Sequence, residues 1–150
     1  MSRFESSRFV RNPKVMHVDV LKSACETLGW TYKITGNELI VTDAKQNTRL
    51  YGEYALKLKL STNEVTYNTY YMPNAAQKVE ELQAQFYALN AAYAKKSLIQ
   101  EFKKKGFNYK ANDHFSPNSE EVYSFFMVGR SKDKNEDEPV AQIKFTILKD

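Results

Sequence analysis

Two short segments of the chain share one order of residue types. Gly29–Lys33 reads Gly-Trp-Thr-Tyr-Lys, and Gly106–Lys110 reads Gly-Phe-Asn-Tyr-Lys, 77 residues further along a chain of 150. Each segment follows a stretch with helical periodicity and opens a stretch rich in β-branched and aromatic residues, which favour strands. We therefore predict that one helix-to-strand unit occurs twice in a single domain, in pseudo-repeats at about residues 1–63 and 64–150.

Periodicity and turn residues predict the order of the elements. An apolar helical stripe over residues 21–28 ends at Gly29, where a left-handed cap would close the helix. Residues 75–105 contain neither Gly nor Pro, and they predict a second, longer helix. Strands are expected at 3–10, 30–34, 39–41, 50–60, 65–72, 107–111, 122–129 and 140–148. This order predicts an α+β fold with two similar strand-helix-three-strand halves, which form a mainly antiparallel sheet with the helices packed on one side.

Composition sets the class of protein and its compartment. Hydrophobic residues make up 42% of the chain, which is enough for a core. The formal net charge of +4 is only weak evidence for anionic partners, since clustering of charge rather than net charge marks a nucleic-acid surface, and an ordinary mildly basic surface explains the charge better. Cys25 is the only cysteine, so no intramolecular disulfide can form and a reducing compartment is expected. The first residues lack the apolar region of a signal peptide, and no apolar run approaches the ~20 residues of a membrane span. We expect a cytoplasmic protein without a membrane partner.

Short motifs in order along most of the chain carry a family resemblance. They are the opening Met1–Phe4, the helix-to-strand stretch Leu21–Trp30, and Tyr93-Ala94, Leu98 and Gly106-Phe107. This arrangement resembles an uncharacterised small-protein family (a domain of unknown function) that is encoded in cyanobacteria and in algal plastid genomes, with relatives in bacteriophages. The family usually has His where this chain has Arg3, which argues against chemistry by an N-terminal His. The resemblance implies a phage or bacterial origin, and a bacterial host cytoplasm if the protein is phage-encoded.

The residue types that carry catalysis or bind metals do not form a familiar constellation. His17 and His114 are isolated in the sequence, and Cys25 lies on the apolar stripe of its helix, where a buried structural thiol is the ordinary case. Neither metal-ligand spacing nor a Gly-rich phosphate-binding loop occurs. We therefore expect a protein that is not an enzyme and that uses no metal and no cofactor.

Lysines and tyrosines on the expected strands are the candidate binding residues. In 50–60, alternation places Lys57 and Lys59 on one face, and the other face carries Tyr54, Leu56, Leu58 and Leu60. The repeated segments add a Tyr-Lys pair each. We predict that the lysines neutralise an anionic ligand while the tyrosines supply flat contact area; the residues are Lys33, Lys57, Lys59, Lys110, Tyr32 and Tyr109.

Two classes of function stay open. The first is a binding or adaptor protein that contacts a partner protein or an anionic ligand through this basic, Tyr-bearing face, or that pairs an edge strand such as Val65–Met72 with a partner. The alternative is a nucleic-acid or nucleotide-binding protein, including one that sequesters a nucleotide, because aromatic residues on an open sheet stack bases while lysines contact phosphate. A homodimer is compatible with either class.

Overall fold

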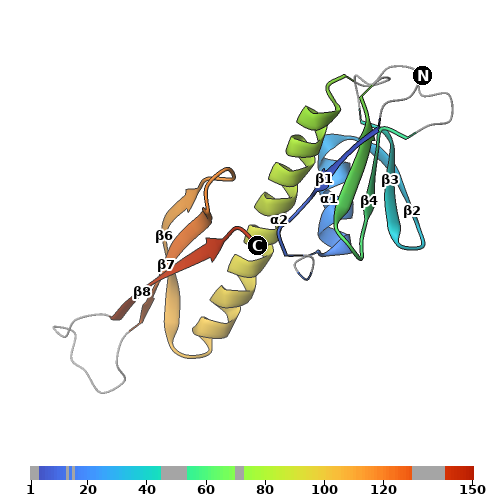
Figure 1. Ribbon diagram of the computed structural model, residues 1–150. Coiled ribbons are helices and arrows are strands. Elements are labelled where there is room, and N and C mark those ends of the chain that lie inside the picture. Colours follow the sequence, from blue (N-terminus) through green and yellow to red (C-terminus); the bar gives the residue numbers. More distant parts are fainter. Residues whose placement is uncertain (1–3, 13, 15, 45–53, 70–72, 130–140) are drawn as a thin grey trace. The chain divides into compact units, whose positions relative to one another are not determined.

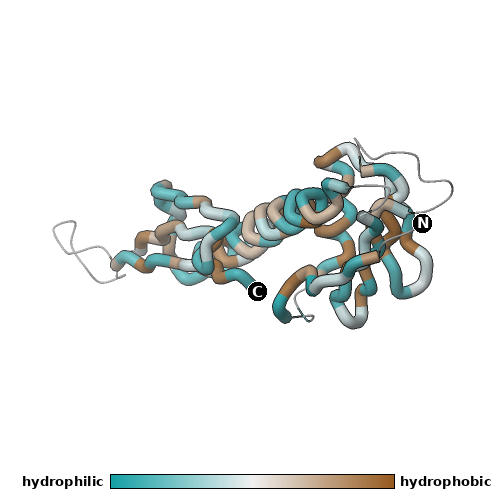
Figure 2. Tube along the Cα trace, turned by 45° about the horizontal axis from the view of Figure 1, so that its top comes forward, coloured by the Kyte–Doolittle hydropathy of each residue, from teal (hydrophilic) through white to brown (hydrophobic). Residues whose placement is uncertain are grey.

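The computed structural model describes residues 4–12, 14, 16–44, 54–69, 73–129 and 141–150 (Figure 1). The chain divides into two compact units, one of residues 1–86 with Asp150 and one of residues 87–149. Helix α1 (Val18–Leu28) belongs to the first unit, and helix α2 (Ala75–Lys103) begins in the first unit and ends in the second. Polar residues recur along α2 (Figure 2), and no helix in the described ranges is long and apolar enough to cross a membrane.

The first unit contains a five-stranded antiparallel sheet, called here the first sheet. Its strands are β1 (Phe4–Arg8), β2 (Thr31–Thr35), β3 (Glu38–Asp43), β4 (Leu56–Lys59) and β5 (Glu64–Asn68). Strands β2 to β5 follow one another as a meander, and β1 pairs with β5, so that the order is β1-β5-β4-β3-β2. The helices pack on one side of this sheet.

The core of the first unit forms between the helices and one face of the first sheet. Burial alternates along β4, where Leu56 and Leu58 are buried while Lys57 is half-buried and Lys59 is exposed. Each fully buried Leu contributes about 1.5–3 kcal/mol through the hydrophobic effect. Apolar residues with at most 2% exposure in this unit include Phe9, Val10, Leu21, Ala24, Cys25, Leu39, Val41, Leu56, Leu58, Val65, Leu82 and Phe86.

The second unit contains a three-stranded antiparallel sheet, the second sheet, with strands β6 (Phe107–Phe115), β7 (Glu121–Gly129) and β8 (Ala141–Leu148) in the order β6-β7-β8. Aromatic rings hold the end of α2 against one face of this sheet. The ring of Phe145 stacks on Phe125 at 5.3 Å, and Phe102 of α2 meets Phe145 edge-on at 4.8 Å. Such pairs stabilise by about 0.5–1.5 kcal/mol beyond the area that they bury.

The predicted α+β class, the antiparallel pairing and the order of elements are confirmed. A strand, a helix and three strands occur twice, as β1-α1-β2-β3-β4 and β5-α2-β6-β7-β8. Helix α1 ends at Gly29, which has the predicted left-handed backbone with φ 74°. Gly106, three residues after the end of α2, also has a left-handed φ, 92°. The strands form two sheets where one was expected. Strand β5 pairs with β1 and β4 and so belongs to the first sheet, and the second sheet contains only β6, β7 and β8 among the described strands. For the same reason the two compact units divide inside α2, and not between β4 and β5, where the second run of elements begins.

Candidate functional site

A row of side chains crosses the face of the first sheet that lies away from the helices. Lys33 on β2 pairs with Ile40 on β3, and Ile40 pairs with Lys57 on β4. Paired residues on antiparallel strands project to the same face, and their buried neighbours Leu39 and Leu58 occupy the opposite face. We call this side the open face of the first sheet. It presents two lysines that flank an aliphatic residue.

Aromatic rings lie beside this row. The ammonium of Lys57 lies 4.5 Å from the centroid of the Tyr54 ring, and the ring of Phe4, which is 48% exposed, lies 5.9 Å from that of Tyr54. Lys59 pairs with Glu38, and Glu38 also approaches Lys57 at 3.9 Å. The prediction that Tyr54 shares the face of Leu56 is wrong, because β4 begins only at Leu56 and alternation does not extend back to residue 54.

The open face of the second sheet carries a matching row. Lys110 on β6 pairs with Phe126 on β7, and Phe126 pairs with Lys144 on β8. Both lysines are exposed and Phe126 is half-buried, whereas its neighbours Phe125 and Met127 are fully buried on the side of α2. Two lysines therefore flank an aromatic ring on this face.

The two rows occupy equivalent positions in the repeated units. Lys33 and Lys110 are the last residues of the repeated segments, and each is followed across the sheet by one apolar residue and a second lysine. In the described part of the chain, Lys33, Lys110 and Lys144 form no ion pair with a carboxylate. The repeat therefore preserves a pair of cations on the open face of each sheet.

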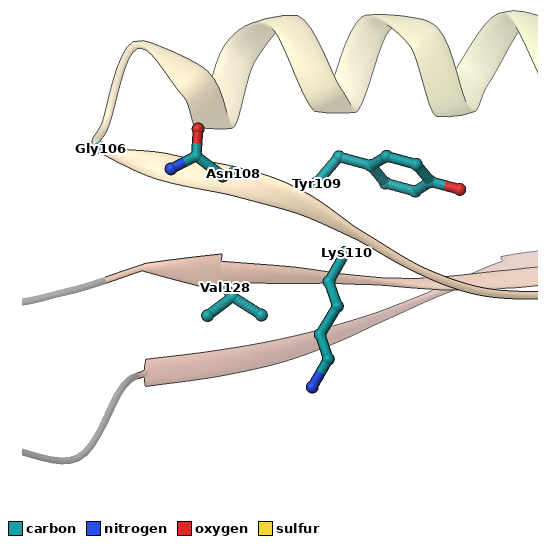
Figure 3. Close-up of a pocket in the computed structure, with 5 residues that line it drawn as sticks. All are labelled: Gly106, Asn108, Tyr109, Lys110 and Val128. Carbon is teal, nitrogen blue, oxygen red and sulfur yellow. The ribbon is translucent and has the colours of Figure 1, made fainter.

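The structure separates the predicted tyrosines from the predicted lysines. The hydroxyl of Tyr32 donates a hydrogen bond of 2.9 Å to Glu26 of α1, and this bond raises the pKa of Tyr32. Tyr109 lies on the α2 side of β6, while Lys110 extends away from α2 (Figure 3). The expectation that Tyr32 and Tyr109 stand beside the lysines is thus corrected. Consecutive strand residues point to opposite faces, so the adjacency of Tyr and Lys in each repeated segment already carried this signal.

Tyr109 belongs instead to a polar cluster that joins α2 to the second sheet. The Lys95 ammonium donates hydrogen bonds to Asp113 and, at 3.1 Å each, to the hydroxyls of Tyr109 and Tyr123. Both hydroxyls donate to Asp113, at 2.5 and 2.6 Å. The ammonium also lies 4.5 Å from the centroid of the Tyr109 ring, a favourable cation–π distance.

At neutral pH the Lys95 side chain of this cluster is protonated and the Asp113 side chain is deprotonated. Burial alone would raise the pKa of Asp113, but the hydrogen bonds from Lys95 and the two tyrosines hold that pKa below its usual value. Burial would lower the pKa of Lys95, and its hydrogen bonds with Asp113 and the tyrosines more than offset this and raise it. Neither group titrates near neutral pH, so the cluster offers a structural cross-link and no general acid or base at that pH.

Cys25 lies on α1 and His17 precedes that helix, as the sequence predicts, whereas His114, beyond the expected strand at 107–111, lies on β6 and pairs with Ser124. Cys25 is fully buried, and burial, with the nearby Glu26 carboxylate, raises the pKa of its thiol to about 12. His17 and His114 are exposed. The expectation that Val65–Met72 forms an edge strand is wrong for the part that the structure describes, because β5 lies between β1 and β4; residues 70–72 lie outside the described ranges.

Sequence reasoning missed Phe126, Lys144, Phe4 and the contact of Tyr54 with Lys57. Strict alternation on β8 between Ile143, Lys144 and Phe145 could have found Lys144, but Phe125 and Phe126 are adjacent aromatics and the sequence does not say which one faces outward.

No family model, curated protein or solved structure matches the chain. The resemblance to the cyanobacterial and plastid family therefore stays a prediction.

Proposed function

We propose that the protein is a non-enzymatic binding protein that holds single-stranded nucleic acid against the open faces of its two sheets. The observation that carries this proposal is the repeated row of lysine, apolar residue and lysine. The same arrangement of charge on two separate sheets favours a ligand with repeated negative charge.

The chemistry of the second row suits a single strand in particular. Lys110 and Lys144 supply ammonium groups for phosphates, and the half-buried ring of Phe126 between them supplies a surface for an unpaired base. Base–aromatic stacking contributes about 1–3 kcal/mol per base and tolerates any sequence. On the first sheet, the ring of Tyr54 lies beside Lys57 and the ring of Phe4 lies beside Tyr54, so this face offers the same combination.

Fluorescence anisotropy with a labelled 12-nucleotide single strand tests the proposal. For single strands the logarithm of the affinity falls with the logarithm of salt concentration at about 0.7 per phosphate contact. Loss of two contacts in Lys110→Ala/Lys144→Ala should then reduce the salt slope by about 1.4 and weaken binding about 25-fold at 0.1 M salt. The equivalent variant of the first sheet, Lys33→Ala/Lys57→Ala, should behave in the same way.

A variant with the same loss of charge serves as the control. Lys22 lies on α1 and Lys104 follows α2, so both lie outside the two open faces. Lys22→Ala/Lys104→Ala should bind within about two-fold of the wild type, since long-range charge effects are screened over about 10 Å at 0.1 M salt. Equal losses in the control and in the face variants would refute a role for the open faces.

An adaptor function is the second candidate, favoured by the edges of the second sheet. Strand β8 has eight residues and pairs only with β7 among the described strands, so its outer edge is able to accept a strand from a partner protein or a second copy of the chain. Such a complex would be insensitive to salt, in contrast to nucleic acid. The proposal keeps the expected cytoplasmic location, because nucleic acid and a reduced cysteine are both found there.

A further inference from the structure

The outer edge of β8 differs from the other sheet edges of the described strands. Strands β1 and β2, at the edges of the first sheet, have five residues each. Strand β6, at the other edge of the second sheet, is interrupted by a bulge between Lys110 and His114. Short strands and bulges discourage pairing with another chain. Strand β8 has eight residues in continuous register, because the irregularity in its ladder lies on β7, so it is the edge best suited to accept a further strand.

Apolar side chains follow this edge. Phe145 contacts Phe102 of α2, and alternation places Ile143 and Ile147 on the same side of the sheet. All three β8 residues are only half-buried, and Leu148 at the end of the strand is 64% exposed. A strand laid along β8 would remove part of this surface from water, which is the main favourable contribution to most protein association.

The sequence of β8 is suited to pairing with a second copy of itself. In a symmetric antiparallel pair the opposed residues share a face, so the two-fold axis passes through one residue, and only an axis at Lys144 or at Phe145 pairs seven of the eight residues. An axis at Lys144 places two lysines directly opposite each other, and like charges in that position are destabilising. An axis at Phe145 places the two Phe145 rings together and sets Ile143 opposite Ile147 on the side of α2. The axis at Phe145 is therefore favoured by both charge and packing.

This register would join the open faces of two second sheets. Lys144 of one copy would lie opposite Thr146 of the other, and within that copy Thr146 pairs with Ser124, which pairs with His114. The second row, which ends at Lys144, would thus continue across the junction through three polar residues of the second copy. Six strands at a spacing of about 4.8 Å give a continuous track of about 24 Å.

The second copy also contributes a cation to this track. The two Lys144 residues would be diagonal neighbours across the junction, at about 7–8 Å, so a phosphate between them would relieve their repulsion. We propose, on the basis of the proposed function, that two copies of the chain pair through β8 about Phe145 and hold one single strand across both second sheets. Lys144 of each copy contacts the phosphate at the junction.

Sedimentation velocity of the full chain tests this pairing through the dissociation constant of the dimer. Thr146 is exposed, and Thr146→Glu would place a carboxylate opposite Lys144 twice in the dimer, so it should tighten the dimer about 2- to 30-fold. Thr146→Lys should weaken the dimer by a similar factor. Gln142→Glu and Gln142→Lys are the matched controls, because they make the same charge changes on the same face of β8 but would lie opposite Leu148. Both controls should stay within about two-fold of the wild type.

The same measurement with a 12-nucleotide single strand, at one strand for two chains, separates this inference from the proposed function. The strand should tighten the wild-type dimer. A monomer at every protein concentration, or equal effects of the Thr146 and Gln142 variants, overturns the pairing through β8. A monomer that binds the strand, and binds it more weakly as Lys110→Ala/Lys144→Ala, overturns the pairing and leaves the open face as the binding surface. A dimer that binds no strand refutes both the proposed function and the shared track.

Discussion

Asn63 provides a quantitative test of how the segment after β1 is held in the first unit. This residue lies in the turn between β4 and β5, is fully buried, and has a left-handed φ of 57°. Its side-chain oxygen accepts a hydrogen bond of 2.9 Å from the N–H of Val10, and its amide donates one of 2.6 Å to the carbonyl of Val10. Asn63 thus fixes the segment that follows β1 against the β4–β5 turn.

The expected loss follows from these contacts. Asn63→Gly leaves the N–H and the carbonyl of Val10 unsatisfied in a buried setting, at about 1–3 kcal/mol each, so a total of about 2–6 kcal/mol is expected. Asn63→Ala adds the penalty of a left-handed backbone for a residue with a Cβ, about 1 kcal/mol more. Alanine should therefore destabilise the first unit more than glycine does.

Urea unfolding followed by tryptophan fluorescence measures this loss. Trp30 is the only tryptophan of the chain and is buried in the first unit, so its emission reports the unfolding of that unit. Asn112 is the matched control, because it also has a positive φ, 82°, but is exposed and has no side-chain hydrogen bond among the described residues. Followed by circular dichroism, Asn112→Gly should be nearly neutral and Asn112→Ala should cost only the backbone penalty. A loss under 1 kcal/mol for Asn63→Gly would refute the reasoning.

Three further predictions concern the second unit. A Cβ on Gly129 would lie 2.6 Å from the ring of Phe107, so Gly129→Ala should destabilise this unit by about 1–3 kcal/mol in urea unfolding followed by circular dichroism, and unchanged stability would contradict the close packing. The pKa of Asp113 is lowered in the folded state, so its stabilisation is present above the unfolded pKa of about 3.9 and is lost as pH falls further. Asp113→Asn should therefore be less stable than the wild type by about 1 kcal/mol at pH 7, and this gap should close near pH 2; a gap that does not change with pH would exclude the ion pair with Lys95 as its source. Phe126→Ala should weaken binding of a single strand by about 1–3 kcal/mol in anisotropy titrations while Phe126→Trp retains it, and equal affinity of both variants would argue against stacking.

Local sequence signals predicted the helices and strands, whereas pairing between distant segments decided how the strands divide into two sheets. The two Gly-aromatic segments, the apolar stripe of α1 and the alternation on β8 follow from neighbouring residues, and all three are confirmed. The sheet to which β5 belongs depends on its pairing with β1, about sixty residues earlier in the chain. Periodicity shows that a segment is a strand but carries no information on its partner, so the division into two sheets was not predictable.

The candidate site was predictable in its charges and less so in its aromatic residues. The prediction that Lys57 and Lys59 share the outer face of one strand is confirmed by their burial, and the register adds Lys33 to that face. Tyr32 and Tyr109 were assigned to the open faces although alternation places each on the side opposite its lysine. Their hydroxyls pair with carboxylates on the helix sides of the sheets. Tyrosine in a strand is thus a weak indicator of a binding face unless its register is known.

The central claim is that the two open faces contact single-stranded nucleic acid, and an NMR titration of the isotopically labelled full chain with a 12-nucleotide strand measures this contact most directly. Residues of both rows, with Lys33 and Lys57 on the first sheet and Lys110, Phe126 and Lys144 on the second, should show the largest shift changes, and these changes should diminish as salt is raised. Shift changes confined to α1 and α2, or none at any strand concentration, would contradict the account.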